Sequence, residues 1–188
     1  MNIQADETLD CKVLACPMPV VKTKKAMEGL KPGQILQVEA TDRGTLADLK
    51  AWSQRTGHQY LGNKEKNGVF FHFIRKVNSK EEQKEAVFPH TVDLKELEQH
   101  HKDPTLVVLD VREPIEYAFG HIPGAKNIPL GEIDKRLSEL NPKQETWVIC
   151  RSGSRSDMAS RKLHEKGFTV KNVVPGMKEW QGPTERNI

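Results

Sequence analysis

The sequence lacks any long hydrophobic run. The longest strictly apolar stretches, such as LVVL at residues 106–109, are far shorter than the roughly 20 residues that a membrane-spanning helix needs. The first ten residues, MNIQADETLD, are acidic and contain no apolar core, so they do not have the pattern of a secretory signal. The sequence therefore predicts a cytoplasmic protein without membrane segments.

Cysteine and net charge are also scarce. Three cysteines in 188 residues, an odd number without an export signal, indicate free thiols in a reducing cytosol rather than a disulfide framework. The net charge at pH 7 is only +3, which does not favour binding to nucleic acid. The histidines show no convincing spacing for metal ligands, since the adjacent His100 and His101 cannot share a helix face. Neither a metal nor a cofactor is expected.

A charged segment separates two halves of the chain. VNSKEEQKEAVF, at residues 77–88, carries charges of both signs and a single aromatic residue, so it cannot bury enough apolar surface to join a core. Within it, SKEE at residues 79–82 fits a capping box and predicts a short solvated helix. The sequence predicts a first domain at residues 1–76, a linker at 77–89 and a second domain at 90–188.

Strand and helix patterns alternate in the first half. A helix is expected from Pro17, because proline is favoured at the first helical position. The pattern predicts strands at 8–10 and 34–40, a second helix at 45–57, and a hairpin of strands at 58–65 and 69–76. The order βαβαββ predicts an α+β two-layer sandwich.

Cys16 directly precedes the first of these helices. Unpaired N–H groups and the positive end of the helix dipole favour a thiolate there and lower the pKa of the thiol. Two prolines beside Cys16 and three lysines on the following turns support a reactive cysteine. The alternative is a buried structural cysteine, which is the commoner role of a lone cysteine.

The segment LDCKVLACPMPVVKTKKAM, residues 9–27, resembles the signature of the TusA-like (SirA-like) sulfur carriers, with Cys16-Pro17-Met18-Pro19 as their Cys-Pro-x-Pro core. The resemblance covers about residues 8–76 and implies that Cys16 carries sulfur as a persulfide. The family usually has glycine at the position of Val13, which leaves the geometry of this loop open. Cys11 is interpreted as a core residue at a strand end, with a resolving thiol for Cys16 as the alternative.

The second half has repeating strand and helix patterns. Helices are expected at 93–101, 113–120, 131–140 and 154–167, and strands at 106–110, 126–130, 147–150 and 170–174. This alternation predicts an α/β domain whose parallel sheet has helices on both sides. Ligands of such sheets bind beyond the C-terminal ends of the strands, and Cys150 is the last residue of a predicted strand.

The loop after Cys150 has the features of an anion site. Arg151, Ser152, Gly153, Ser154 and Arg155 supply successive backbone N–H groups just before a helix, and the glycine permits a tight curve. A thiolate pKa in such surroundings falls to roughly 3.5–7.5. Cys150 is the predicted nucleophile, and the five loop residues form the predicted substrate site.

Two reaction classes use such a loop. Phosphatases need a cysteine and an arginine with five residues between them, whereas only four residues separate Cys150 from Arg155. The smaller loop fits a single sulfur atom better than a phosphoryl group. Sulfur chemistry is therefore favoured over phosphatase or arsenate reductase chemistry.

The second half resembles a single rhodanese domain over about residues 90–183. LDVREPIEYAFGHIPGAKNIPL at residues 109–130 and CRSGSRS at residues 150–156 carry the resemblance. It implies a sulfurtransferase of the thiosulfate type, in which Cys150 takes sulfur as a persulfide from a small donor and yields it to an acceptor. Asp110 and Arg112 match the family's Asp-x-Arg, and His121 begins its His-Ile-Pro-Gly-Ala segment, all in supporting roles.

Together the two halves predict a sulfurtransferase in which sulfur is exchanged between Cys150 and Cys16. Its expected partners are a small sulfur donor, such as thiosulfate or a persulfide, and a thiol or protein acceptor. The alternative is a non-catalytic sulfur-binding or redox-regulatory adaptor whose two thiols sense rather than turn over.

Overall fold

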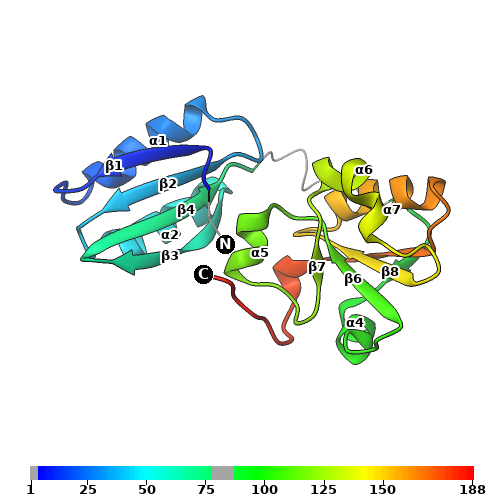
Figure 1. The fold of residues 1–188 in the computed structure, drawn as a ribbon. Coiled ribbons are helices and arrows are strands. Elements are labelled where there is room, and N and C mark those ends of the chain that lie inside the picture. Colours follow the sequence, from blue (N-terminus) through cyan, green and yellow to red (C-terminus); the bar gives the residue numbers. More distant parts are fainter. Residues whose placement is uncertain (1–3, 78–86) are drawn as a thin grey trace. The chain divides into compact units, whose positions relative to one another are not determined.

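The computed structural model describes residues 4–77 and 87–188. The chain divides into two compact units, each with its own β-sheet (Figure 1). The capping box expected at residues 79–82 lies outside the described residues. In the described ranges, no helix is both long enough and apolar enough to span a membrane.

The first unit is a four-stranded sheet with two helices. Its elements are β1 (Glu7–Cys11), α1 (Met18–Gly29), β2 (Ile35–Ala40), α2 (Thr45–Thr56), β3 (Gln59–Lys66) and β4 (Val69–Arg75). The strands lie in the order β1-β2-β4-β3, with only the β1–β2 pair parallel. Asn67 and Gly68 both have positive φ in the turn between β3 and β4, as a two-residue hairpin turn requires. The predicted α+β sandwich is confirmed.

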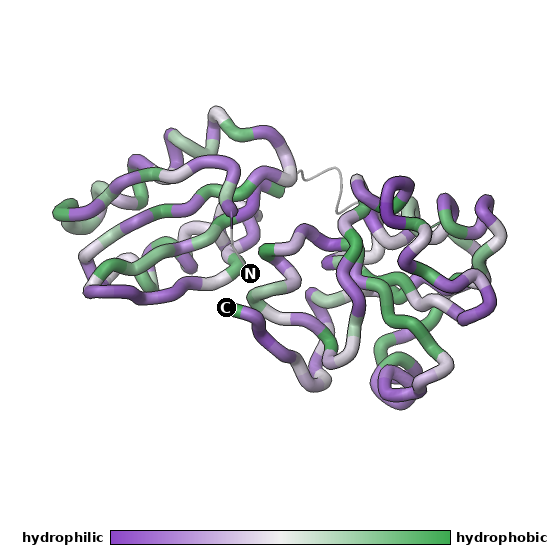
Figure 2. The backbone as a smooth tube through the Cα atoms, viewed as in Figure 1, coloured by the Kyte–Doolittle hydropathy of each residue, from purple (hydrophilic) through white to green (hydrophobic). Residues whose placement is uncertain are grey.

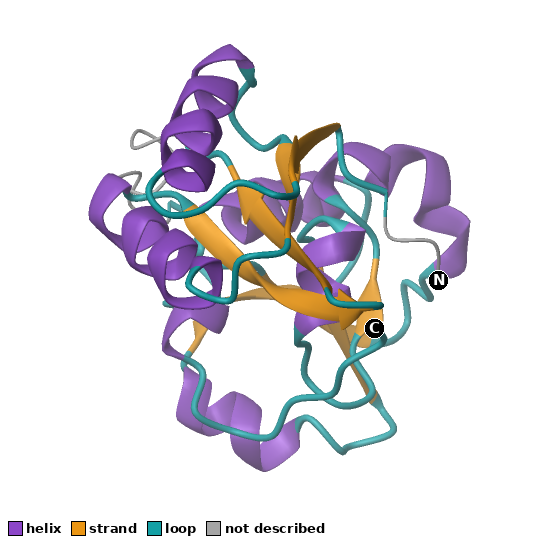
Figure 3. Cartoon of the chain, turned by 90° about the vertical axis from the view of Figure 1, so that its left-hand side faces the viewer, coloured by secondary structure: helices purple, strands orange, loops and turns teal. Residues whose placement is uncertain are grey.

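The second unit contains a five-stranded parallel sheet. Its strands are β5 (Thr91–Val92), β6 (Leu106–Asp110), β7 (Lys126–Asn127), β8 (Glu145–Ile149) and β9 (Val170–Val173), in the order β5-β9-β8-β6-β7. The helices are α4 (Leu94–His100), α5 (Pro114–Phe119), α6 (Ile133–Arg136) and α7 (Ser154–Glu165), with short 3₁₀ turns η1 (Leu130–Glu132), η2 (Leu137–Glu139) and η3 (Met177–Glu179). After η3 the chain ends in an irregular segment (Figure 3).

Both faces of this parallel sheet are buried. Leu109 and Val148 pack into one core cluster together with α7 residues such as Leu163. Val108 and Trp147, their neighbours along the strands, pack into a second cluster. Strands covered on both faces become continuous hydrophobic runs, which are visible as green stretches in Figure 2. The predicted α/β fold of this half is confirmed.

The structure differs from the sequence prediction at one helix, one strand and one linker residue, and it adds β5, which was not predicted. The helix expected at 131–140 is broken into the turns η1 and η2 around the short α6, because short helices have few internal hydrogen bonds and packing of Ile133 against the core decides their geometry. The strand expected at 126–130 ends at Asn127, and Pro129 lacks the N–H that continued pairing would need. Phe88, assigned to the linker, is buried in a core of the second unit.

His72 on β4 forms a buried polar network in the first unit. The hydroxyl of Thr45 donates to the Asp42 carbonyl oxygen (2.6 Å) and lies 3.0 Å from Nε2 of His72. The Tyr60 hydroxyl lies 2.8 Å from Nδ1. With its own proton already donated, Thr45 accepts from Nε2–H, and Nδ1 accepts from Tyr60. Both contacts suit a neutral ring, and burial lowers the pKa of His72 to about 4.

This network predicts a pH-dependent stability of the first unit. A histidine whose folded pKa is depressed contributes fully above its unfolded pKa of about 6.5, and its contribution is lost as the pH falls toward 4. The free energy of unfolding should fall by roughly 3 kcal/mol across that window. Urea unfolding of the wild type and of His72→Gln, at about pH 7 and about pH 5, measures this loss. If the free energy of unfolding changed equally between the two pH values in both proteins, His72 would not be the group responsible.

Candidate active site

Cys150 lies at the C-terminal edge of the parallel sheet. β8 ends at Ile149, one residue earlier than predicted, so Cys150 directly follows the strand. Its side chain is fully buried. Residues 151–153 form a short loop, and α7 begins at Ser154. The sulfur therefore sits between the end of a central strand and the start of a twelve-residue helix.

Two groups donate hydrogen bonds to the sulfur of Cys150. The Gly153 N–H lies 3.2 Å from Sγ, and the Ser156 hydroxyl lies 3.3 Å from it. Gly153 adopts a φ of +90°, and a Cβ there would lie 3.1 Å from Cγ1 of Val174. Glycine is therefore required both by the left-handed conformation and by the close packing. Of the successive backbone N–H groups predicted to surround the sulfur, that of Gly153 donates to it among the described contacts, and the Ser156 hydroxyl is a second donor.

The outer side of the loop is held by residues after β9. The carbonyl oxygen of Cys150 accepts from Met177 N–H (2.8 Å), and that of Arg151 accepts from Lys178 N–H (2.9 Å). A Cβ on Gly176 would lie 2.6 Å from the Cys150 carbonyl oxygen, so only glycine permits this approach. These bonds fix the carbonyl groups of Cys150 and Arg151 against the segment after β9.

Arg155 was predicted to bind substrate, but its guanidinium group is occupied by Glu116. Nη1 and Nη2 lie 2.7 and 3.0 Å from the two carboxylate oxygens, and both side chains are buried. Burial alone would lower the pKa of Arg155, but the attraction of Glu116 outweighs it and raises the pKa above its ordinary value. The charge of Arg155 still acts on Cys150. We therefore regard Arg155 as part of the support of the loop.

The other loop residues differ in exposure. Arg151 and Ser152 are half-buried, whereas Ser154 is buried at the start of α7. Arg151 thus remains the arginine of the loop that is open to solvent, and its role in binding a donor stays a prediction.

The side chains of Asp110, Arg112 and His121 form hydrogen bonds to groups within residues 110–121. Arg112 donates from Nε and Nη2 to the Asp110 carboxylate and from Nη2 to the Gly120 carbonyl oxygen (2.8 Å). The ring of His121 stacks on Tyr117, with 3.7 Å between centroids, and its Nδ1 pairs with the Tyr117 carbonyl oxygen. None of these three side chains donates to the Cys150 sulfur in the contacts of the described residues. Their supporting roles stay a prediction.

Four residues of the site were not identified from the sequence: Glu116, Ser156, Asn172 and Gly176. The only local signal for Glu116 is a charged residue between the apolar Ile115 and Ala118. Ser156 was included only as the last residue of the CRSGSRS segment, without a role of its own. Asn172, on β9, donates from Nδ2 to the Gly153 carbonyl oxygen (3.3 Å), a contact that no sequence pattern indicates.

Cys16 is exposed in the loop before α1, and its predicted low pKa is wrong. The pKa of the thiol is raised, chiefly because it hydrogen bonds to the Asp48 carboxylate, with further contributions from burial and from the charges of Asp48 and Asp42. Asp42 also accepts from the backbone N–H of Cys16 (3.0 Å). These carboxylates, at and just before the start of α2, offset the helix dipole on which the prediction depended.

The structure also defines the conformation of Val13 and the environment of Cys11. Val13 has a φ of +62°, a conformation that favours glycine, and its N–H donates to the Thr41 hydroxyl (3.0 Å). The valine therefore adopts a backbone conformation that glycine accommodates more easily. Cys11 is fully buried in the core, and burial raises the pKa of its thiol, which supports the core interpretation.

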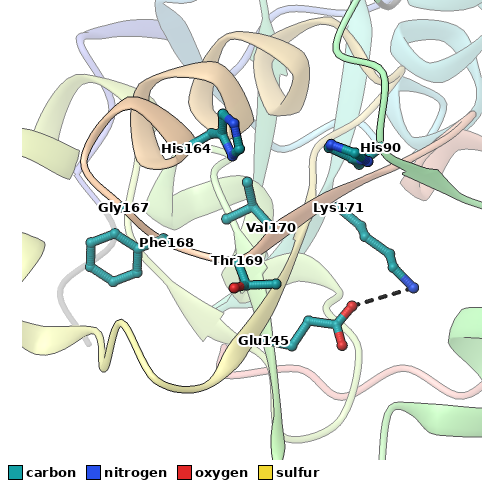
Figure 4. Close-up of a pocket in the computed structure, with 8 residues that line it drawn as sticks. All are labelled: His90, Glu145, His164, Gly167, Phe168, Thr169, Val170 and Lys171. Atoms are coloured by element: carbon teal, nitrogen blue, oxygen red, sulfur yellow. Dashed lines mark ion pairs between the residues drawn. The ribbon is translucent and has the colours of Figure 1, made fainter.

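A separate hollow of about 340 Å³ lies at the other end of the parallel strands, where β8 and β9 begin (Figure 4). His90 and His164 face it, and Lys171 pairs there with Glu145, the first residue of β8 (3.3 Å). Among the described residues, no group of three or more histidine, cysteine or acidic side chains could hold a metal ion.

A buried cysteine at the C-terminal edge of a parallel α/β sheet, with backbone and hydroxyl donors at its sulfur, defines a domain of the rhodanese class. A family model described as "Rhodanese-like domain" matches residues 93–183. A second model, described as "Sulfurtransferase TusA", matches residues 7–76.

One relative matches almost the whole chain, and others match part of it. YrkF of Bacillus subtilis (strain 168), named as a candidate sulfur carrier protein, is 48% identical over 185 residues, which are 97% of this chain and 100% of YrkF. YrkI of the same organism, named likewise, is 49% identical over 39% of this chain and 99% of its own length. A rhodanese-related protein from Thermoplasma volcanium is 31% identical with a TM-score of 0.48, over 51% of this chain and 97% of its own. The chain belongs to the sulfur carrier and sulfurtransferase family that joins a TusA domain to a single rhodanese domain.

Proposed function

We propose that Cys150 takes sulfane sulfur from a small anionic donor such as thiosulfate. The Cys150 thiolate attacks the outer sulfur of the donor, forms a new S–S bond and releases sulfite, which leaves with the electron pair of the broken bond. A nucleophilic acceptor, a thiolate or a protein cysteine, then attacks the outer sulfur of the persulfide and releases the Cys150 thiolate. No external oxidant or reductant is needed.

The observation that carries this proposal is the environment of the sulfur. The Gly153 N–H and the Ser156 hydroxyl both point at Sγ, next to the start of α7, and charge-assisted donors of this kind stabilise an anionic sulfur. Arg151, half-buried in the same loop, attracts the anionic donor. The reaction takes place in the cytosol, where thiols stay reduced.

Cys16 is the acceptor within the chain in this proposal. It is exposed, as a carrier that meets several partners must be. Because its pKa is raised, only a small fraction is thiolate at neutral pH, and thiolate attack on the Cys150 persulfide is slower than for a low-pKa thiol. Transfer to Cys16 should therefore become faster as the pH rises.

The test is to incubate the full chain with thiosulfate and to locate added sulfur by intact and peptide mass. We expect one sulfur on Cys150 first, and sulfur on Cys16 later and only when Cys150 is present. The matched control is Cys150→Ser. Sulfur on Cys16 in that variant would contradict transfer from Cys150 to Cys16, and a wild type that takes up no sulfur would contradict the whole proposal.

A further inference from the structure

A fully buried asparagine is an unusual residue in the centre of a parallel sheet. Asn172 lies on β9, paired with Val148 of β8 and Thr91 of β5, and none of its side chain is exposed. Its Oδ1 has no hydrogen-bond partner among the described residues. Leaving a buried polar atom unpaired costs about 1–3 kcal/mol, so an apolar residue would stabilise the fold better at this position.

Among the described residues, the amide nitrogen makes one hydrogen bond, to the loop of the active site. Nδ2 donates to the carbonyl oxygen of Gly153 (3.3 Å). The same oxygen accepts from the Asp157 N–H (3.0 Å), the first backbone hydrogen bond of α7, and from the hydroxyl of Ser156 (3.1 Å). Three donors thus surround one carbonyl oxygen.

The carbonyl oxygen of Gly153 cannot accept a full hydrogen bond from all three donors. A carbonyl oxygen has two lone pairs, and the Asp157 N–H takes one of them. The Asn172 amide and the Ser156 hydroxyl compete for the second. The hydroxyl has a single proton, and its other acceptor is the sulfur of Cys150 (3.3 Å).

We propose that Asn172 is a positioning residue that acts through Ser156. By occupying the second lone pair of the Gly153 carbonyl oxygen, the amide leaves the Ser156 hydroxyl free to donate to the Cys150 sulfur. The same bond anchors the carbonyl oxygen of Gly153, the residue whose N–H also donates to the sulfur. This inference rests on the proposed role of Cys150 as the reacting sulfur.

The experiment measures the rate at which iodoacetamide alkylates Cys150 in the full chain at neutral pH, followed by peptide mass so that Cys11 and Cys16 do not interfere. Asn172→Leu should lower this rate about ten-fold, the effect of losing one hydrogen bond to a charged group. Ser156→Ala should lower it by a similar factor. The double variant should be no slower than either single variant, because both remove the same hydrogen bond.

The matched control is Thr146→Val. Thr146 is a buried residue of the strand that leads to Cys150, and its hydroxyl also lacks a partner among the described residues. This substitution should leave the alkylation rate unchanged. An equal loss in Thr146→Val would overturn the proposal, since the effect would then come from general repacking of the core.

Two other outcomes would also overturn it. One is a multiplicative loss in the double variant, which would mean that Asn172 acts independently of Ser156. The other is a lower melting temperature of Asn172→Leu with an unchanged alkylation rate, which would make the residue purely structural. Asn172→Val, which suits a strand, repeats the test if the leucine variant does not fold. Alkylation requires no sulfur donor, so a protein that reacts at Cys150 but takes no sulfur would refute the proposed function alone.

Discussion

Cys150→Ser is expected to abolish sulfur transfer from thiosulfate to cyanide, to the background of the uncatalysed reaction. The serine hydroxyl occupies the same position between the Gly153 N–H and the Ser156 hydroxyl, but it is neither ionised at neutral pH nor able to form a persulfide. The loop itself should persist, because its carbonyl groups are held by Met177 and Lys178. The measurement is thiocyanate formation by the full chain.

Cys16→Ser is the matched variant for this experiment. A small acceptor such as cyanide can reach the Cys150 persulfide directly, so this variant should keep most of the activity. If Cys16→Ser removed the activity as completely as Cys150→Ser, the roles assigned to the two cysteines would be wrong. A wild type with negligible turnover would instead favour an adaptor whose thiols bind sulfur without catalysis.

Glu116→Ala is expected to be the most destabilising single substitution considered for the second unit. It removes both hydrogen bonds that the carboxylate makes with the buried Arg155, and breaking a buried ion pair by removing one partner costs about 3–5 kcal/mol. Because Arg155 lies in the first turn of α7, the sulfur site should lose activity as well. Urea unfolding at neutral pH measures the loss of free energy.

Two controls isolate the buried charge as the cause. Arg136 pairs with Glu139 through two hydrogen bonds on the surface, and Glu139→Ala should cost less than about 1 kcal/mol, as exposed ion pairs do. The double substitution of Glu116 and Arg155 by methionine should lose less stability than Glu116→Ala, because no buried charge remains. A loss below about 1 kcal/mol in Glu116→Ala would refute the importance of the pair.

Hydrophobic patterns predicted most of the fold, because the order of apolar and polar residues along a strand depends on whether one or both of its faces are buried. The strands expected at 106–110 and 147–150 begin with continuous apolar runs, which are typical of strands covered on both faces. β5 was missed because two residues, Thr91 and Val92, carry no period of their own. Its pairing with β9 comes from the register of the finished sheet.

The centre of the candidate site was predictable for the same reason. Cys150 and Gly153 are neighbours in sequence, and a glycine after a strand and before a helix has few conformations that satisfy its backbone. Contacts between distant segments were not predictable. Glu116 meets Arg155 across 39 positions, and Asp42 meets Cys16 across 26; neither pair has a local signal. The prediction of a low pKa for Cys16 was wrong for the same reason, because the carboxylates that raise this pKa come from the start of another helix.

The carboxylates beside Cys16 also affect how readily its thiol is oxidised. Oxidation of cysteine to sulfenic acid, and onward to forms that cells cannot reverse, begins from the thiolate. An exposed cysteine with a low pKa is therefore the one most readily damaged by peroxide. Asp48 and Asp42 raise the pKa of Cys16, so this exposed thiol is mostly protonated and reacts slowly with oxidants. If Cys16 is the acceptor proposed above, we expect its free thiol to be oxidised slowly between one transfer of sulfur and the next.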